Sequence, residues 1–307
     1  GSILLIDNQI SLGQFVAAEI IIILIMNSIE KLIVGLESVY DVLTSLEKVG
    51  AITDMPLEEE KTKNPSALKE TDGFAVSVEN LSFKYPGTDK TVIDKINMKI
   101  ECGEKVGLSG KQGSGKTTLL QLLTGIYEDH DGRITYNGVP LSALCHDDLR
   151  LEIGDNIWQE TIFKGSVREN ITLGKHGVHD EMVMEALQAV SAVDSLNQLE
   201  DGLNTLLFPE GVKIPRSLAK KIILARSIVS EPKLLLIELE TDFMTQKEQE
   251  NFLDYILSKP WTLIAVSDES DFLERTNRLY FMDSGSMVFE GRYSDFKNSE
   301  YAEYIRK

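Results

Sequence analysis

The stretch Gly110-Lys111-Gln112-Gly113-Ser114-Gly115-Lys116-Thr117-Thr118 decides how this chain folds. It has the spacing G-x-x-x-x-G-K-T, it follows a short apolar segment, 105–108, and it precedes an apolar run, 119–123. A strand, this loop and a helix form a P-loop, in which backbone N–H groups point into one concavity and the helix dipole favours an anion. We therefore expect residues 110–118 to bind a nucleoside triphosphate, with Lys116 at the β- and γ-phosphates and the Thr117 hydroxyl on Mg²⁺.

Length, composition and charge limit the classes of protein to which the chain can belong. Its 307 residues allow one large or two modest domains, and its apolar content of 42% is enough for a substantial core. The formal charge of −18 argues against nucleic acid or an anionic membrane surface as the main partner. We expect no nucleic-acid partner.

The N-terminal fifty residues differ from the rest of the chain. Ser11 and Gln14 have the spacing of a helix capping box, and the run 15–26 that follows is apolar except for Glu19. Twelve residues are fewer than the roughly 20 of a membrane span, so hydropathy alone leaves a span and a buried soluble helix both open. A second pattern predicts a helix that packs on partner helices, through apolar residues spaced alternately by three and four: Ile29, Leu32, Leu36, Val39, Leu43 and Leu46. This helix should end near Gly50.

The remainder of the chain alternates strands and helices after a polar, charged linker, 51–73. This alternation predicts an α/β fold with a mainly parallel core sheet, an antiparallel β portion near its start and helices on its faces. The expected strands are 74–85, 92–101, 133–136, 233–240 and 262–267, with a late hairpin at 279–290. The expected helices are 181–199, 217–229 and 246–258.

Two further motifs flank the P-loop, Phe83-Lys84-Tyr85-Pro86-Gly87 before it and Ile157-Trp158-Gln159-Glu160 after it. With the apolar helix and the linker, they make the chain resemble half-transporter exporters of the ATP-binding cassette (ABC) family. The resemblance implies the end of a transmembrane domain at 1–50, a linker at 51–73 and an ABC-type nucleotide-binding domain with a helical subdomain at 74–307. Tyr85 looks like the family's adenine-stacking aromatic residue. Gln159 resembles the glutamine that senses Mg²⁺ and the γ-phosphate.

Other positions depart from the family's pattern. The segment Ile214-Pro215-Arg216-Ser217-Leu218 stands where the family has L-S-G-G-Q; Pro215 has no N–H to donate there, although Ser217 could cap the following helix. Glu238 replaces the aspartate that holds Mg²⁺. Leu239 stands at the position of the catalytic glutamate and Asp268 at that of the switch histidine. Glu240 could replace the missing base only if the strand end were rearranged.

The resemblance implies ATP and Mg²⁺ as cofactors and a second half-transporter chain, identical or different, as partner. It places the protein in a bacterial inner (plasma) membrane, with the nucleotide-binding domain in the cytoplasm and a peptide or protein as the favoured export substrate. The altered positions predict an exporter ATPase that binds ATP and hydrolyses it slowly. The alternative is a degenerate subunit that binds ATP and acts as a structural or regulatory half of a transporter.

Overall fold

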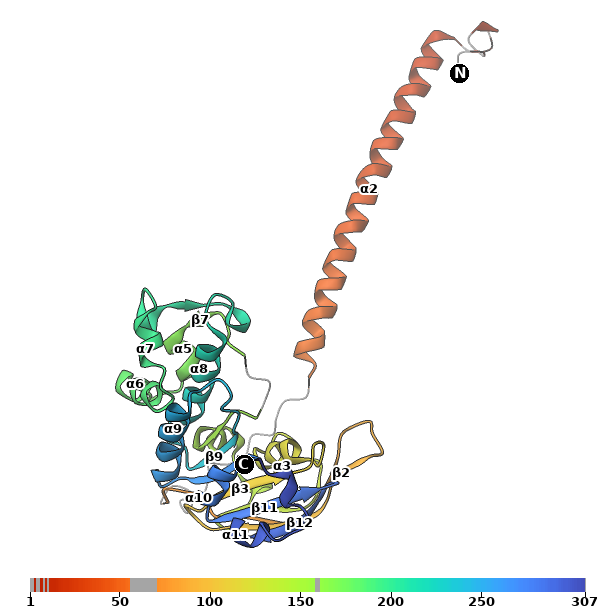
Figure 1. Ribbon diagram of the computed structural model, residues 1–307. Helices are drawn as coiled ribbons and strands as arrows, with labels where there is room; N and C mark the ends of the chain where they lie inside the picture. The colour runs from red at the N-terminus through yellow and green to blue at the C-terminus, as the bar shows by residue number, and fades with distance from the viewer. Residues whose placement is uncertain are drawn as a thin grey trace. The chain divides into compact units, whose positions relative to one another are not determined.

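The chain divides into two compact units, 1–59 and 60–307, so the division falls inside the predicted linker. The first unit contains one long helix, α2 (Leu12–Thr53), and the second is an α/β domain (Figure 1). This computed structural model describes Ile3, Ile6, Asp7, Gln9 and the ranges 11–55, 71–157 and 161–306.

Helix α2 begins at the predicted capping box. Ser11 Oγ accepts a hydrogen bond from the Gln14 amide at 3.2 Å, and Gln14 Oε1 accepts one from the Ser11 amide at 2.9 Å. The helix continues past Gly50 and ends at Thr53, because Asp54 is its C-cap. Its 42 residues correspond to a length of about 63 Å, roughly twice the thickness of a bilayer's hydrocarbon core. Its most apolar window has a mean hydropathy of 2.0, so by length and composition α2 is able to cross a membrane.

The larger sheet of the α/β domain carries the P-loop. Its strands run parallel except for β12, which pairs antiparallel with β11. In the order in which they are hydrogen-bonded, the strands are β12 (Ser286–Gly291), β11 (Arg278–Asp283), β3 (Lys105–Gly110), β10 (Thr262–Val266), β9 (Leu234–Glu238) and β6 (Ile153–Asp155).

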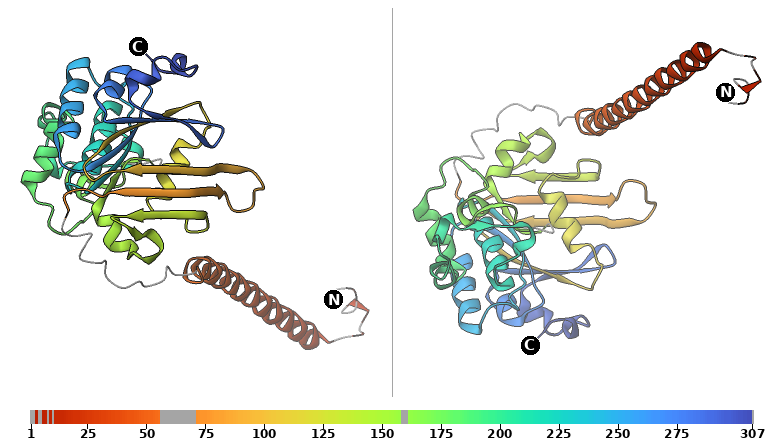
Figure 2. Two further views of the ribbon diagram at one scale, coloured as in Figure 1. Left: turned by 90° about the horizontal axis from the view of Figure 1, so that it is seen from below. Right: turned by 90° about the horizontal axis from the view of Figure 1, so that it is seen from above.

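A second, antiparallel sheet confirms the antiparallel portion expected near the start of the domain. Helix α3 (Lys116–Leu123) lies between this sheet and the larger one in both views of Figure 2. In hydrogen-bonded order the strands are β2 (Thr91–Ile100), β1 (Val76–Lys84), β4 (Asp131–Tyr136) and β5 (Val139–Pro140).

The helical subdomain lies beside the larger sheet (Figure 1). The expected single helix 181–199 is wrong, because Ser191 has a left-handed φ of 53° and breaks the segment into two helices. The subdomain and the short β7–β8 pair comprise β7 (Gly165–Ser166), α5 (Val167–Thr172), α6 (Asp180–Ala189), α7 (Val193–Asn197), η3 (Gly202–Asn204), β8 (Leu206–Leu207), η4 (Pro209–Gly211) and α8 (Arg216–Ile228). The remaining helices are η2 (Leu141–Ala143), α4 (His146–Glu152), α9 (Gln246–Ser258), α10 (Ser270–Arg275), α11 (Tyr293–Phe296) and η5 (Ala302–Tyr304).

Two hydrophobic cores cover the two faces of the larger sheet. Leu235 and Ile237 of β9 pack with the helical subdomain, whereas Leu234 and Leu236 pack with α3 and the antiparallel sheet. This division follows from the two-residue period of a strand. Strands β3, β10 and β9 are parallel neighbours that are buried on both faces. Because they are parallel, their carboxyl ends meet at one edge of the sheet. Ligands of open α/β sheets bind outside this edge.

Candidate phosphate and metal site

The P-loop connects β3 to α3 and depends on glycine at two positions. A Cβ atom at Gly110 would lie 2.3 Å from the Met282 carbonyl oxygen, and one at Gly115 would lie 2.8 Å from Ile93 Cδ1. Both glycines also have positive φ angles, 153° and 97°. The loop therefore curls tightly between β11 and β2, as the sequence pattern predicts.

Lys116 reaches back over the loop. Its Nζ donates hydrogen bonds to the carbonyl oxygens of Gly110, at 2.7 Å, and Lys111, at 3.0 Å. Burial lowers the pKa of Lys116, although the nearby carboxylates of Asp268 and Glu238 favour its charged form. The ammonium group is thus held at the loop, where an anion would be its natural counter-charge.

Ser114 supplies a second observation that fits a phosphate. Its hydroxyl is buried and has no hydrogen-bond partner among the described residues. Buried hydroxyl groups are normally hydrogen-bonded, so this one is available to a ligand in the loop. A Cβ at Gly113 would meet no atom within 4 Å, so the loop is open on that side.

The metal-binding residues predicted from the sequence lie together. Thr117, in the first turn of α3, donates its hydroxyl hydrogen to Glu238 Oε1 at 2.5 Å, and Glu238 is the last residue of β9. A hydroxyl and a carboxylate are hard oxygen ligands of the kind that Mg²⁺ prefers. The residues present therefore fit an Mg²⁺ ion, which Thr117 and Glu238 would hold. Gln159, the third predicted metal-binding residue, lies outside the described residues.

Asn156, which the sequence interpretation missed, fixes the backbone of Glu238. Asn156 Oδ1 accepts a hydrogen bond from the Glu238 amide at 2.7 Å, and Asn156 Nδ2 donates one to the Glu238 carbonyl oxygen at 3.1 Å. These two bonds join the end of β9 to the chain just beyond β6. The short strand β6, Ile153-Gly154-Asp155, has no pattern that marks Asn156, and the contact depends on the pairing of β6 with β9.

Leu239 occupies the position that the resemblance assigns to the catalytic base. It is only 8% exposed, belongs to the core beneath the helical subdomain and donates its amide to the Val266 carbonyl oxygen at 2.9 Å. A hydrocarbon side chain cannot accept a proton from water. This position therefore offers no general base.

The Glu240 side chain is directed to Lys220 of α8 rather than to the P-loop. Its Oε2 lies 3.2 Å from Lys220 Nζ, and Asp242 Oδ1 lies 3.1 Å from the same nitrogen. Partial burial works against the charge on Lys220, but the hydrogen bonds that its ammonium group donates to Asp242 and Glu240 outweigh it and raise the Lys220 pKa. With 71% of its side chain exposed, Glu240 would have to leave this ion pair to act as a base.

Asp268, at the switch-histidine position, lies beyond the end of β10 and is anchored to the strand that leads into the P-loop. Its Oδ1 accepts a hydrogen bond from Ser109 Oγ at 2.6 Å. A carboxylate is therefore held next to the phosphate loop, where the resemblance expects a histidine.

Tyr85 lies beside α3 through its ring and its hydroxyl. The hydroxyl shares a hydrogen bond of 2.9 Å with Thr118 Oγ1, and the ring packs edge-on against Phe83 and Tyr127 with centroid distances of 5.1 and 5.5 Å. The structure thus places Tyr85 next to the last residue of the P-loop motif. Its stacking on adenine stays a prediction.

The segment 214–218 at the signature position forms the start of α8. The helix begins at Arg216 with Pro215 at its N-cap and no side-chain capping bond, so the expectation that Ser217 caps it is wrong. Ser217 lies in the first turn, because the non-helical backbone of Pro215, with ψ of 138°, directly precedes the helix. Arg216 is exposed and Leu218 is buried, which leaves a cation where the family pattern has glycine.

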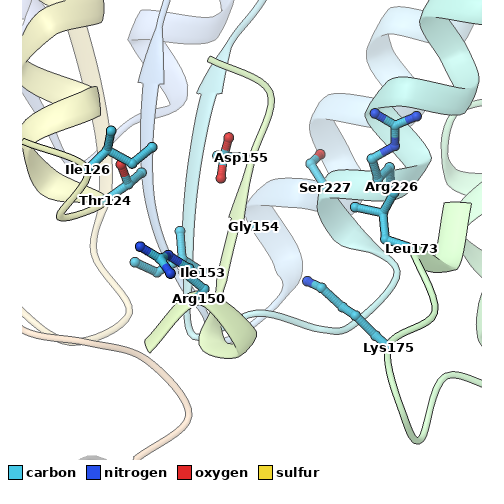
Figure 3. Close-up of a pocket in the computed structure, with 10 residues that line it drawn as sticks. All are labelled: Thr124, Ile126, Arg150, Ile153, Gly154, Asp155, Leu173, Lys175, Arg226 and Ser227. Atoms are coloured by element: carbon cyan, nitrogen blue, oxygen red, sulfur yellow. The ribbon is translucent and has the colours of Figure 1, made fainter. Parts of the chain in front are cut away.

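A separate cavity of about 280 Å³ lies at the opposite end of α3, next to its C-cap, Thr124 (Figure 3). Figure 3 shows Asp155 at the end of β6 on one side and Ser227 and Arg226 of α8 on the other. Burial raises the pKa of Asp155, against a hydrogen bond from the Ile157 amide and the charge of Lys175. The sequence interpretation did not predict this cavity, and the predicted phosphate site does not share it.

Strand β3, its glycine loop, Lys116 and the Thr117–Glu238 pair together define a P-loop nucleotide-binding protein. Residues 93–238 match the family model of ABC transporters, so this part of the chain has the sequence pattern of that family's ATP-binding domain. The fold class and the resemblance expected from the sequence are thereby confirmed.

Curated relatives and a solved structure agree with this assignment. The chain is 28% identical over 308 residues to the alpha-hemolysin translocation ATP-binding protein HlyB of Escherichia coli O157:H7, covering 98% of this chain and 43% of the relative. It is 26% identical over 297 residues to the leukotoxin translocation ATP-binding protein LktB of Mannheimia haemolytica, covering 96% and 42%. A bacterial Atm1-family ABC exporter with ATP bound has the same fold, with a TM-score of 0.75 and 22% identity over 85% of this chain and 46% of that one. The chain thus spans less than half the length of these proteins.

Proposed function

We propose that the chain is the ATP-binding part of an ABC exporter whose own site binds MgATP and hydrolyses it slowly. One contrast carries this proposal. The phosphate and metal residues Lys116, Thr117 and Glu238 are assembled, whereas a buried leucine, Leu239, stands where the catalytic base belongs.

The residues for binding are distributed along the edge of the two sheets. The amides of 110–118, the Ser114 hydroxyl and Lys116 bind the phosphates, and Tyr85 packs against adenine. Thr117 and Glu238 hold Mg²⁺, with Gln159 assigned to the same ion by resemblance. When bound, MgATP supplies the γ-phosphoryl group and the metal's charge.

Hydrolysis is expected to be slow, because the site has no positioned general base to activate the attacking water. A positioned general base contributes roughly 10²- to 10⁴-fold, or about 3–5 kcal/mol of activation free energy. Leu239 contributes nothing of this kind, and Glu240 is engaged with Lys220. The negative charge of Asp268 disfavours further charge on the γ-phosphate.

Two observations support a role in export: the apolar surface of helix α2 and the names of the relatives. None of the side chains of α2 is buried within the chain, so its apolar surface is suited to lipid or to other membrane helices. We assign the protein to a bacterial inner (plasma) membrane, with its nucleotide-binding domain in the cytoplasm and a second half-transporter chain, identical or different, as partner. The relatives are named for translocation of alpha-hemolysin and leukotoxin, which favours a peptide or protein substrate. We propose no nucleic-acid partner.

The alternative is a degenerate subunit that binds ATP and acts only as a structural or regulatory half. Pro215 favours it, because a proline at the start of α8 removes one N–H that an opposing phosphate would need. A catalytic partner chain would then provide turnover.

The dependence of ATP binding on Mg²⁺ tests the assembled metal site. In equilibrium binding, Mg²⁺ should raise the ATP affinity of the wild-type protein by roughly tenfold relative to EDTA, because the ion links phosphate to Thr117 and Glu238. Glu238→Gln should lose most of this gain. Glu181→Gln, an exposed change on α6, is the matched control and should keep it. Equal affinity with and without Mg²⁺ in the wild type would contradict the assignment.

A further inference from the structure

The C-terminal segment places an arginine, Arg306, at the edge of the sheet that carries the P-loop. The Arg306 amide donates a hydrogen bond to the Asp268 carbonyl oxygen at 2.7 Å, and the Ser270 amide donates one to the Arg306 carbonyl oxygen at 3.0 Å. These bonds make a parallel bridge between Arg306 and Glu269. Arg306 is therefore fixed directly beside the residue at the switch-histidine position.

Side-chain packing holds this segment in place on the side of the P-loop. The rings of Tyr301 and Tyr304 lie 5.1 and 6.1 Å from the ring of Phe281, and Ile305 is buried. Both tyrosines also face the ammonium group of Lys111, at 5.6 and 5.3 Å from their ring centroids. The position of Arg306 is thus determined by contacts with β11 and with the loop itself.

Arg306 lines a cavity of about 510 Å³ together with residues of the candidate phosphate and metal site. Its lining includes Glu238, Leu239, Asp268 and Arg306. Lys220, which also lines it, has its charge paired with Glu240 and Asp242. The exposed guanidinium of Arg306 has no ion pair or side-chain hydrogen bond within the described ranges 71–157 and 161–306.

Carboxylates outnumber cations in the lining of this cavity: the acidic residues are Glu238, Glu240, Asp242, Asp268 and Glu269, and the basic residues are Arg216, Lys220 and Arg306. Asp268 places an anion beside the P-loop and directs its carboxylate to Ser109 rather than to Arg306. A terminal phosphate near Glu238 would meet this anion, and a cation from the same cavity would offset it. An arginine is suited to this task because its planar fork donates several hydrogen bonds to phosphate oxygens.

We propose that Arg306 binds the terminal phosphate of ATP and supplies the positive charge that position 268 lacks, so that this chain distinguishes ATP from ADP through its own C-terminal segment. The inference rests on the proposed ATP-binding function. It concerns binding, and it does not require that the site hydrolyse ATP.

Equilibrium binding of ATP and of ADP, each with Mg²⁺, tests the proposal without reference to activity. Arg306→Gln should weaken ATP binding about tenfold, as expected for the loss of one charge-assisted hydrogen bond, and should change ADP binding by less than about twofold. Arg306→Lys should lose less of the ATP affinity. Arg292→Gln, an exposed arginine change before α11, is the matched control and should alter neither affinity.

A double variant separates a phosphate contact from a general effect of charge. Asp268→His in the Arg306→Gln background should restore the preference for ATP over ADP, because the imidazole returns a donor to position 268. Unchanged ATP binding in Arg306→Gln, or equal weakening of ATP and ADP, would overturn the inference. Wild-type protein that binds neither nucleotide would instead contradict the proposed function itself.

Discussion

Replacing Leu239 with glutamate is expected to raise the rate of MgATP hydrolysis by roughly 10²- to 10⁴-fold, the contribution of a positioned general base. Leu239 follows Glu238 directly and lines the same cavity, so a carboxylate at this position would face the space next to Glu238, the residue proposed to hold Mg²⁺. Steady-state release of phosphate from saturating MgATP measures the effect. Adding Asp268→His should raise the rate further, because it removes an anion beside the P-loop.

Leu239→Gln is the matched control for this substitution. Glutamine has nearly the shape of glutamate and disturbs the core around Leu239 in the same way, but it cannot accept a proton at neutral pH. It should bind ATP and show no gain in turnover. An equal gain in both variants would mean that the effect comes from loosened packing. No gain in a folded, ATP-binding Leu239→Glu protein would contradict the missing base as the cause of slow hydrolysis.

Replacing Lys116 with alanine is expected to weaken MgATP binding by roughly 10- to 100-fold. The ammonium group is held over the loop by the carbonyl oxygens of Gly110 and Lys111, at 2.7 and 3.0 Å, and is thus positioned before any phosphate arrives. A hydrogen bond to a charged group contributes about 1.5–3 kcal/mol, and each 1.4 kcal/mol is about tenfold in affinity. Titration with ATP at constant Mg²⁺ measures the change.

Lys247→Ala provides the control for Lys116→Ala, because Lys247 is an exposed lysine in the first turn of α9. Its removal takes away one positive charge without touching the P-loop, so ATP binding should be unaltered. If Lys116→Ala and wild type bound ATP equally well, the nucleotide would not occupy this loop. Thermal unfolding of the variant shows whether the chain remains folded.

Local patterns predicted those parts of the fold that depend on neighbouring residues. The capping box at Ser11 and Gln14, the P-loop and helix α9 (Gln246–Ser258) were predicted with nearly the bounds observed. Each of these is specified by spacing within one segment. The break at Ser191 was not predicted, because the left-handed conformation of a serine gives no signal in hydrophobic periodicity.

Contacts between distant segments could not be predicted in the same way. The resemblance to the ABC family marked Glu238 and Asp268, but nothing in the sequence indicated that Asn156 binds the Glu238 backbone or that Ser109 binds the Asp268 carboxylate. These partners are far apart in the chain and meet because parallel strands end at one edge of the sheet. The pairing of Glu240 with Lys220 likewise depends on how α8 packs against β9.

The rate of MgATP hydrolysis by the purified wild-type protein, at a concentration that its own binding isotherm shows to be saturating, tests the central claim most directly. Enzymes typically turn over about 10 times per second, and loss of the base should lower this to about 0.1 per second or less. We expect saturable ATP binding with turnover in that low range. Turnover of about 10 per second in the wild type, abolished by Glu240→Gln, would contradict the claim. Glu240 would then act as the general base in place of Leu239.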